Sequence, residues 1–249
     1  MREQEIVVTT PDGKMKVFLV HPSKGGPFPV ALLFMDGIGY REQIRANARR
    51  FAGAGYYVAA PDLFYRSGDG TILDMTKLMS AGMESPEGKR FREIVSSVTP
   101  ARVESDIQAI LENIRDDGLA DTSSLVCVGY CMGARLALHV AATRDDMRAM
   151  AGVHPGALVT DQPDSPHNDL ATVRGEVYFA FAEQDRSATP ESIDAFRTAI
   201  ADAGVRGTVE RLPGTAHGFA MADLPVYNHD ACEHHFEHTL ELWRRARAA

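Results

Sequence analysis

Cysteine is scarce in this sequence. Only three cysteines, Cys127, Cys131 and Cys232, occur among 249 residues. They are an odd number and lack the CxxC spacing of zinc sites, which argues against a disulfide framework and against a structural metal. At least one thiol is therefore expected to be free.

The sequence also lacks a basic excess and a long apolar run. It holds 26 basic and 34 acidic residues, for a net charge of −8. Because no basic cluster could neutralise a run of phosphates, nucleic acid is not an expected partner. No apolar run is long enough to span a bilayer, and the first residues, MREQEIVVTTPDG, contain no apolar signal region. We therefore expect a cytoplasmic protein that does not associate with membranes, as a monomer or homodimer.

What the chain does contain is the composition of an ordinary folded protein. Hydrophobic residues make up 45% of it and charged residues 24%, enough to bury a sizeable core. We find no internal repeat and no internal boundary. The sequence thus predicts one domain over residues 1–249, with residues 71–98 as a candidate lid or insertion.

Short apolar runs alternate with amphipathic segments along most of the chain. The first two runs flank the turn signal Thr10-Pro11-Asp12-Gly13, which predicts an antiparallel hairpin at the N-terminus. Later runs are continuously apolar, as in strands buried on both faces. The expected strands are Glu5–Thr9, Lys14–Val20, Val30–Met35, Tyr56–Ala60, Leu125–Gly129, Ala149–Val153, Val177–Phe181 and Thr208–Leu212.

Helical spacing is clearest from Ala101 to Arg115, where Thr99 supplies an N-cap and Pro100 a first-turn proline. Polar, breaker-rich stretches at Gly82–Lys89 and Thr160–Asp169 are expected to be loops. Further helices are expected at Arg41–Ala54, Met132–Thr143, Pro190–Ala203 and Cys232–Arg247. The pattern predicts an α/β fold, with a mostly parallel central sheet of about eight strands and helices on both faces.

The most informative motif is Gly129-Tyr130-Cys131-Met132-Gly133, which has the form G-x-C-x-G. It lies where an expected strand passes into an expected helix. A nucleophile at such a turn needs glycines two residues before and after it, so that the neighbouring backbones can approach. The N-terminus of the helix also favours a thiolate over a thiol. The pattern predicts that Cys131 is a nucleophile, whereas Cys127 is expected to be an inert core residue.

A cysteine nucleophile needs a base and a group that orients the base. In this kind of fold they follow in the order nucleophile, acid, histidine. Asp185 and His217 come in that order, each just past an expected strand. Cys131, His217 and Asp185 are therefore predicted to form a catalytic triad, with Glu183 as the rival acid nearer the strand.

Such a triad also requires donors for an oxyanion. In this kind of fold they are the N–H of the residue after the nucleophile and an N–H from the loop after an early central strand. These positions are Met132 and Gly37, and Gly37 lies in the glycine-rich loop Asp36-Gly37-Ile38-Gly39.

At this point the chain resembles the dienelactone hydrolase family, the branch of the α/β-hydrolases with a cysteine nucleophile. The resemblance is carried by the segments LLFMDGIGY, GYYVAAPDLFYRSG, VGYCMGAR, LVTDQPDSPH, AEQD and GTAHGFA. It implies Cys131, Asp185 and His217 as the triad. It also implies hydrolysis of a small-molecule ester or lactone through an acyl-thioester, and no cofactor or metal is expected.

The resemblance also implies roles for positions where this chain departs from the pattern. Asp36 stands where family members have a glutamate that holds the resting thiol, so Asp36 is a candidate for gating it. Met221 stands where they have an arginine for a substrate carboxylate. Unless Arg66 or another arginine substitutes, a neutral or bulkier ester or lactone is expected.

Three other interpretations remain open. His234-His235-Phe236-Glu237-His238 matches H-x-x-E-H, an inverted zinc-protease signature. A third ligand is needed, and among the residues after the motif only Glu241 could serve. A non-enzymatic ligand-binding relative of the fold and a thiol redox sensor at Cys131 are the other two.

Overall fold

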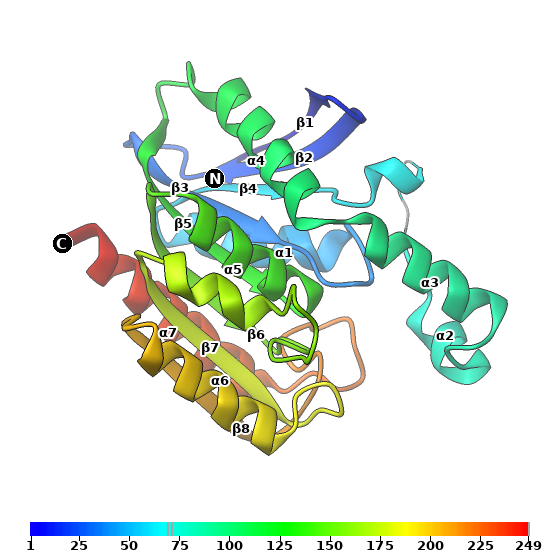
Figure 1. Ribbon diagram of the computed structural model, residues 1–249. Helices are drawn as coiled ribbons and strands as arrows, with labels where there is room; N and C mark the ends of the chain where they lie inside the picture. The colour runs from blue at the N-terminus through cyan, green and yellow to red at the C-terminus, as the bar shows by residue number, and fades with distance from the viewer. Residues whose placement is uncertain (69, 71, 249) are drawn as a thin grey trace.

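The computed structural model describes residues 1–68, 70 and 72–248. The chain forms one eight-stranded sheet with helices on both faces (Figure 1). The strands are β1 (Arg2–Thr10), β2 (Gly13–His21), β3 (Phe28–Phe34), β4 (Tyr57–Pro61), β5 (Ala120–Tyr130), β6 (Met147–Val153), β7 (Glu176–Gln184) and β8 (Gly207–Ala216).

The sheet has the order β1-β2-β4-β3-β5-β6-β7-β8. β1 pairs with β2 antiparallel, and β2 pairs with β4 antiparallel. The pairs from β4 through β8 are parallel, so their carboxyl ends meet at one edge. The predicted fold class is confirmed, including the hairpin at the N-terminus.

Helices cover both faces of the sheet because each presents an apolar stripe to it. Figure 1 shows α4, α5 and α6 in front of the sheet and α1 and α7 behind it. The helices are α1 (Glu42–Gly53), α2 (Met75–Ala81), α3 (Pro86–Ser97), α4 (Pro100–Ile114), α5 (Met132–Thr143), α6 (Pro190–Asp202) and α7 (His229–Ala248). Two short 3₁₀ turns span Tyr65–Ser67 and Pro166–Thr172.

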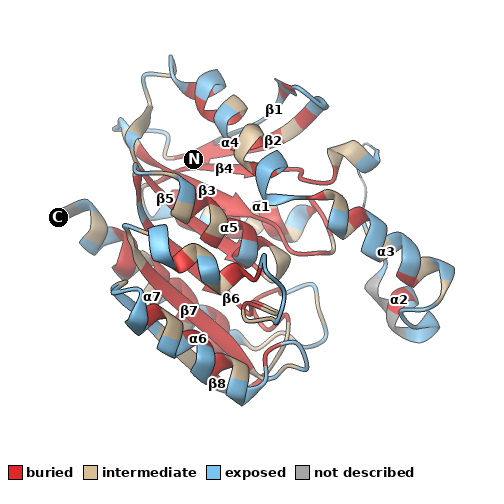
Figure 2. Ribbon diagram, viewed as in Figure 1, coloured by how far each residue is buried: buried red, intermediate tan, exposed pale blue. Residues whose placement is uncertain are grey.

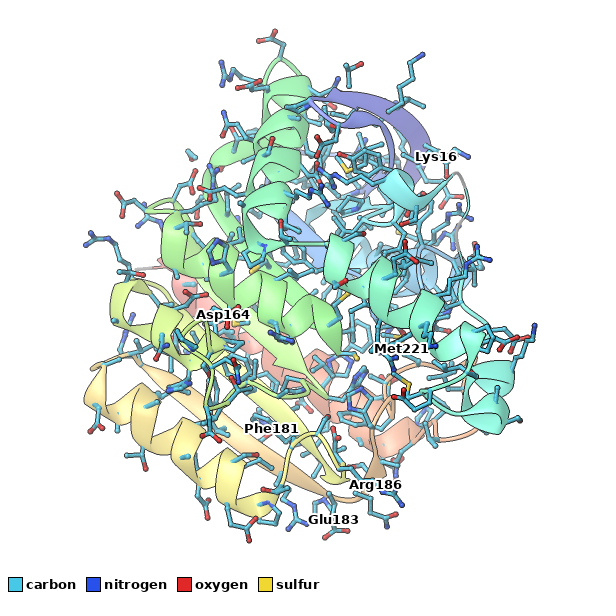
Figure 3. All side chains as sticks on the ribbon, turned by 45° about the vertical axis from the view of Figure 1, so that its right-hand side comes forward. Lys16, Asp164, Phe181, Glu183, Arg186 and Met221 are labelled. Atoms are coloured by element: carbon cyan, nitrogen blue, oxygen red, sulfur yellow. The ribbon has the colours of Figure 1, made fainter. Side chains whose placement is uncertain are left out.

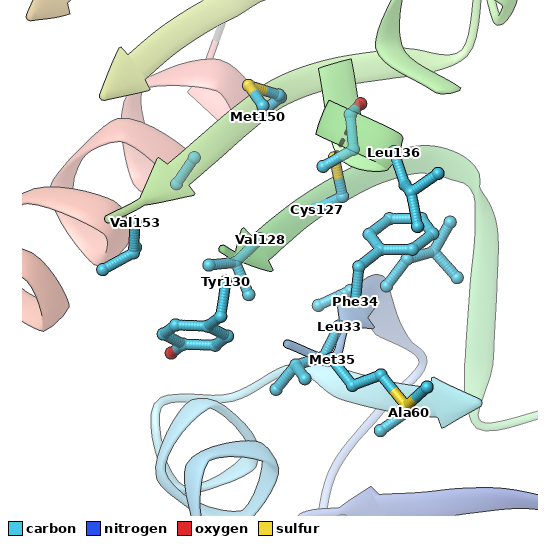
Figure 4. Packing of buried hydrophobic residues seen from close by; sticks show 14 of the residues in the cluster. Leu33, Phe34, Met35, Ala60, Cys127, Val128, Tyr130, Leu136, Met150 and Val153 are labelled. Carbon is cyan, nitrogen blue, oxygen red and sulfur yellow. Dashed lines mark hydrogen bonds between the residues drawn. The ribbon is translucent and has the colours of Figure 1, made fainter. Parts of the chain in front are cut away.

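The core lies along the central strands, which are buried over most of their length (Figure 2). Cys127 is fully buried on the α5 side of β5, where its thiol points at the carbonyl oxygen of Ala137 at 3.8 Å (Figure 4). Burial raises the pKa of this thiol far above its usual range. Cys127 therefore has the inert core position that its place inside a strand predicted.

The segment between β4 and α4 contains more helix than the sequence predicted. The stretch Gly82–Lys89 was expected to be a loop, but α3 begins at Pro86, where Ser85 accepts a hydrogen bond from Gly88 N–H at 3.0 Å. α2 precedes it, and both helices extend to one side of the sheet (Figure 1).

Among the described residues, no helix has the length and apolar character needed to cross a membrane.

Candidate active site

The chain makes a sharp turn between β5 and α5, and Cys131 is the single residue in that turn. β5 ends at Tyr130 and α5 begins at Met132. Cys131 has φ 53° and ψ −115°, a backbone conformation that residues with a Cβ seldom adopt. The turn moves the side chain of Cys131 off the strand, and the residue is half-buried rather than packed in the core.

Two glycines make this turn possible. A Cβ on Gly129 would overlap the carbonyl oxygen of Gly133, and a Cβ on Gly133 would overlap the carbonyl oxygen of Phe34. The backbones of β5, α5 and β3 therefore approach each other more closely than any residue larger than glycine would permit. This is the physical basis of the G-x-C-x-G spacing.

The catalytic residues predicted from the sequence lie together at the carboxyl edge of the sheet. His217 follows β8, and its Nε2 lies 3.0 Å from the Cys131 sulfur. Asp185 follows β7, and its Oδ2 lies 2.5 Å from Nδ1 of His217. One imidazole thus bridges thiol and carboxylate, an arrangement that can move a proton from sulfur to nitrogen and stabilise the resulting charge.

Asp185 is positioned by Ser187, a residue that the sequence did not point to. The N–H and the hydroxyl of Ser187 donate to Oδ1 of Asp185 at 2.8 and 2.6 Å. Burial alone would raise the pKa of Asp185, but its bonds to His217 and Ser187 lower the pKa overall. The rival acid Glu183 accepts instead from Gly214 N–H at 2.9 Å.

The charge around His217 favours the imidazolium. Burial by itself would lower its pKa, but the adjacent Cys131 sulfur and the Asp185 carboxylate raise it to about 10. The imidazole of His217 therefore carries a proton at neutral pH. This ring also meets the buried ring of His154, with centroids 5.2 Å apart.

The two expected oxyanion donors lie beside the turn. Met132 is the first residue of α5, so its N–H has no acceptor within the helix. Gly37 follows β3, whose last carbonyl oxygens face Gly133 in the first turn of α5. Within the described ranges, neither N–H donates to another residue of the chain.

Asp36 is not paired with the thiol, contrary to the role that the resemblance implied. Its two carboxylate oxygens accept from Arg41 at 2.7 and 3.0 Å, and Oδ1 also accepts from Ile38 N–H at 3.0 Å. Arg41 in turn donates to Asp223 at 2.6 and 3.1 Å. The planar guanidinium five residues away outcompetes a thiol, because it offers two parallel hydrogen bonds and a full charge.

Arg66 is also engaged elsewhere. Its guanidinium binds both oxygens of Asp106 at 2.8 Å and Asp12 at 2.7 Å, and it lines a separate cavity with Arg90 and Arg102. Met221, at the position of the family arginine, is fully buried with its sulfur 3.9 Å from the Asn47 amide (Figure 3). Neither residue is placed to bind a substrate carboxylate.

A cavity of about 700 Å³ lies beside Met132, next to the turn at Cys131. Met132 and Arg135 of α5 line one wall, and Phe91 and Val95 of α3 line another. The same α3 side chains lie over Gly37, since a Cβ on that glycine would be 3.6 Å from the Phe91 ring. The candidate lid segment therefore covers both the expected oxyanion donors and the cavity beside them.

The fold and this cysteine, histidine and aspartate arrangement define the class of the protein: it is an α/β-hydrolase. More closely, residues 15–246 match the model of the dienelactone hydrolase family. The chain belongs to that family, and it is a hydrolase of the lactone and ester class.

Curated relatives cover most of the chain. A protein of Methylorubrum extorquens with the provisional name carboxymethylenebutenolidase is 27% identical over 246 residues, which span 97% of this chain and 80% of that protein. The carboxymethylenebutenolidase of Pseudomonas putida is 26% identical over 185 residues, 72% of this chain and 73% of that enzyme.

Solved structures share the fold at lower identity. A protein of Klebsiella pneumoniae, provisionally assigned as a dienelactone hydrolase, superposes with a TM-score of 0.85 at 21% identity, covering 98% of each chain. A dienelactone hydrolase-like promiscuous phosphotriesterase from metagenomic libraries gives a TM-score of 0.74 at 20% identity, covering 99% of each chain.

Proposed function

We propose that this protein hydrolyses a small carboxylic ester or lactone, with Cys131 as the nucleophile. The observation that carries the proposal is the continuous chain of contacts from the Cys131 sulfur through the His217 imidazole to the Asp185 carboxylate. A thiolate beside an imidazolium at a helix N-terminus is an activated nucleophile.

The first half of the reaction forms a thioester. The Cys131 thiolate attacks the carbonyl carbon, and the negative charge that develops on the carbonyl oxygen is held by the N–H groups of Met132 and Gly37. As the tetrahedral intermediate collapses, the carbon–oxygen ester bond breaks. His217 gives its proton to the departing alkoxide, which in a lactone stays attached to the acyl group.

The second half consumes one water molecule. Neutral His217 takes a proton from the water, which attacks the thioester carbonyl through a second oxyanion at the same two N–H groups. Collapse of this intermediate releases the carboxylic acid and the Cys131 thiolate, while the proton remains on His217. Asp185 keeps the imidazole oriented and stabilises its charge in both halves.

The cavity beside Met132 indicates which substrates fit. Phe91, Val95 and Met132 offer apolar contacts to an acyl chain or ring. Arg135 is exposed on the same wall and, in the part of the chain that the structure describes, pairs with no carboxylate. We infer that Arg135 takes over the recognition of a substrate carboxylate that Met221 cannot provide, while neutral substrates bind through the apolar walls alone.

The decisive experiment traps the thioester. The protein is mixed briefly with a small activated aryl ester and quenched in acid, and its peptides are mapped by mass spectrometry. We expect one acyl group on the peptide containing Cys131. The adduct should form normally in the Cys232→Ala control, because this thiol is buried beside Ala220 and Arg50 and does not touch the triad.

Steady-state rates complete the test. Cys131→Ala should abolish turnover, and His217→Ala should lower kcat/KM by roughly 10³-fold or more, because triad members act as a unit. Near-normal turnover in either variant, or acylation on another side chain, would contradict the proposal. A protein with no adduct and no turnover of any ester would instead be a ligand-binding or redox relative.

A further inference from the structure

Three potential metal ligands meet far from the triad, between the edge strand and the last helix. Glu210 projects from β8, and His234 and His238 project from α7. One ligand atom from each residue lies within 4.8 Å of the other two. Glu210 pairs with Ala180 within the sheet, whereas His217 lies beyond the end of β8, so the cluster is separate from the active site.

The contacts within the cluster suit metal ligation. The Nε2 atom of His234 lies 2.9 Å from Oε2 of Glu210. His238 places its Nδ1 3.0 Å from the carbonyl oxygen of His234, which leaves Nε2 as the atom available to an ion. Histidine ligands usually donate their second ring N–H to such a carbonyl, because this fixes the tautomer and the ring orientation.

Tyr178 of β7 contacts two of the three residues. Its hydroxyl donates to Oε2 of Glu210 at 2.9 Å, and its ring stacks on His238 with centroids 5.5 Å apart. Tyr178 thus orients Glu210 and His238, as neighbouring side chains commonly do for metal ligands.

We propose that Glu210, His234 and His238 bind one divalent transition-metal ion of the zinc type. Two imidazole nitrogens and one carboxylate oxygen are ligands that Zn²⁺ accepts, with water in the fourth position. Tetrahedral bonds of about 2.0 Å require ligand atoms about 3.3 Å apart. The 2.9 Å between His234 Nε2 and Glu210 Oε2 must therefore open slightly, and the third ligand atom, within 4.8 Å of these two, must adjust to the same spacing. Partial exposure, 38% for His234 and 28% for Glu210, permits that rotation.

The fold supplies the ligand that the H-x-x-E-H pattern lacked. His234 and His238 share one face of α7 because they are four residues apart. The third ligand comes from β8 rather than from Glu241 on the same helix. A bound ion would fasten the last helix to the edge of the sheet, which indicates a stabilising site rather than a catalytic one.

The test is a zinc titration of tag-free, chelator-treated protein by calorimetry, in a Cys131→Ala background that removes the catalytic thiol. We expect one Zn²⁺ per chain, and a melting temperature that rises with zinc because the ion binds only the folded state. His238→Ala and Glu210→Gln should each weaken binding by at least about tenfold. Absence of binding, or unchanged affinity in both variants, would overturn the proposal.

Two further variants separate ligation from general damage. Tyr178→Phe leaves the three ligands in place and should weaken zinc binding by roughly 10–100-fold, as loss of an outer-shell partner does. His229→Ala, on the same helix but paired with Asp230, should bind zinc like the parent. An equal loss in His229→Ala would show that the helix was perturbed rather than the site.

The hydrolase proposal and the zinc proposal can be tested independently, since either one could be wrong without the other. With Cys131 present, His238→Ala should hydrolyse esters at the parent rate, because its side chain does not touch the triad. Co²⁺ offers a second readout, since a thiolate ligand gives an intense charge-transfer absorption and a histidine and carboxylate site does not. Such a band, lost in Cys131→Ala, would place the metal at the triad instead and overturn the assignment.

Discussion

Two arginines at the carboxyl edge of the sheet differ in what surrounds their charge. Arg41 is buried between Asp36 and Asp223 and donates to both. Arg135, in the first turn of α5, is exposed toward the cavity beside Met132. A guanidinium already bound by two carboxylates cannot recognise a third, whereas an unpaired one on a cavity wall can.

We predict that Arg135→Ala changes substrate preference rather than chemistry. The KM for a lactone that carries a carboxylate should rise roughly tenfold, since a charged hydrogen bond contributes about 1.5–3 kcal/mol. The KM for a matched neutral lactone should stay the same. Steady-state kinetics on both substrates provide the check, with Arg115→Ala, an exposed arginine at the end of α4, as control. Equal losses on both lactones would rule out carboxylate recognition.

Residue contacts show how far the sequence could predict the site. The order Cys131, Asp185, His217 was readable because each follows a strand of a parallel sheet, and such strands end at one edge. The partner of Asp36 could not be predicted in the same way. The resemblance pointed to the thiol, while the competing Arg41 lies five residues away at the N-cap of α1, after a loop whose shape no periodicity predicts.

At the scale of elements, the junction of β5, α5 and β3 determines the position of the Cys131 side chain. Its backbones are in contact at Gly129, Gly133 and Phe34. Added volume at this point has no flexible side chain to displace, because the atoms that it would meet belong to the backbone. The junction must therefore shift as a unit if either glycine gains a side chain.

We predict that Gly129→Ala lowers the free energy of unfolding by about 1–3 kcal/mol or more, as overpacking of a tight contact does. Activity should fall with it, because the Cys131 sulfur moves relative to His217. Urea unfolding and ester turnover would measure the two effects. Gly118→Ala is the matched control, since a Cβ there meets no atom within 4 Å. A Gly129→Ala protein as stable as this control would contradict the close approach.

The elements also show where sequence patterns lose information. The cap and proline that predicted α4 are confirmed, with Thr99 accepting from Arg102 N–H at 3.4 Å. The same signals, Ser85 and Pro86, precede α3, yet that segment was interpreted as a loop. The buried residues of α3 are Gly88 and Ile94, so few apolar residues mark its inward face in the sequence.

At the scale of the whole molecule, buried histidines make folding sensitive to acid. His154 and His235 are fully buried, and their ring nitrogens have no hydrogen-bond partner among the residues that the structure describes. Burial and the Arg50 charge lower the pKa of His235 to about 3, and burial with the charge of His217 lowers that of His154 well below its usual range. Both rings stay neutral in the folded protein at pH values where they are protonated in the unfolded chain.

We therefore predict that stability falls as the pH falls from about 6.5 to about 4.5. In this window the unfolded chain binds protons that the folded protein does not, at about 1 kcal/mol per pH unit for each histidine. Below about pH 5.5 His217 adds little slope, because it is protonated in both the folded and the unfolded state, whereas nearer pH 6.5 its raised folded pKa gives a partial slope of the opposite sign. His235→Phe should remove about half of the slope in urea unfolding curves, whereas His229→Phe, at an exposed position, should leave it unchanged. Equal slopes in both variants would exclude His235 as a source.

The ion pairs of Arg41 limit which substitutions are tolerated at positions 36 and 41. Asp36 lies before α1 and Asp223 lies six residues after His217, so a single guanidinium joins loops from distant parts of the chain. Losing Arg41 alone would leave the buried Asp36 carboxylate without its charged partner. Such a loss typically lowers the free energy of unfolding by about 3–5 kcal/mol. Lineages should therefore rarely tolerate an isolated change here, and positions 36 and 41 are expected to be inherited together or replaced together.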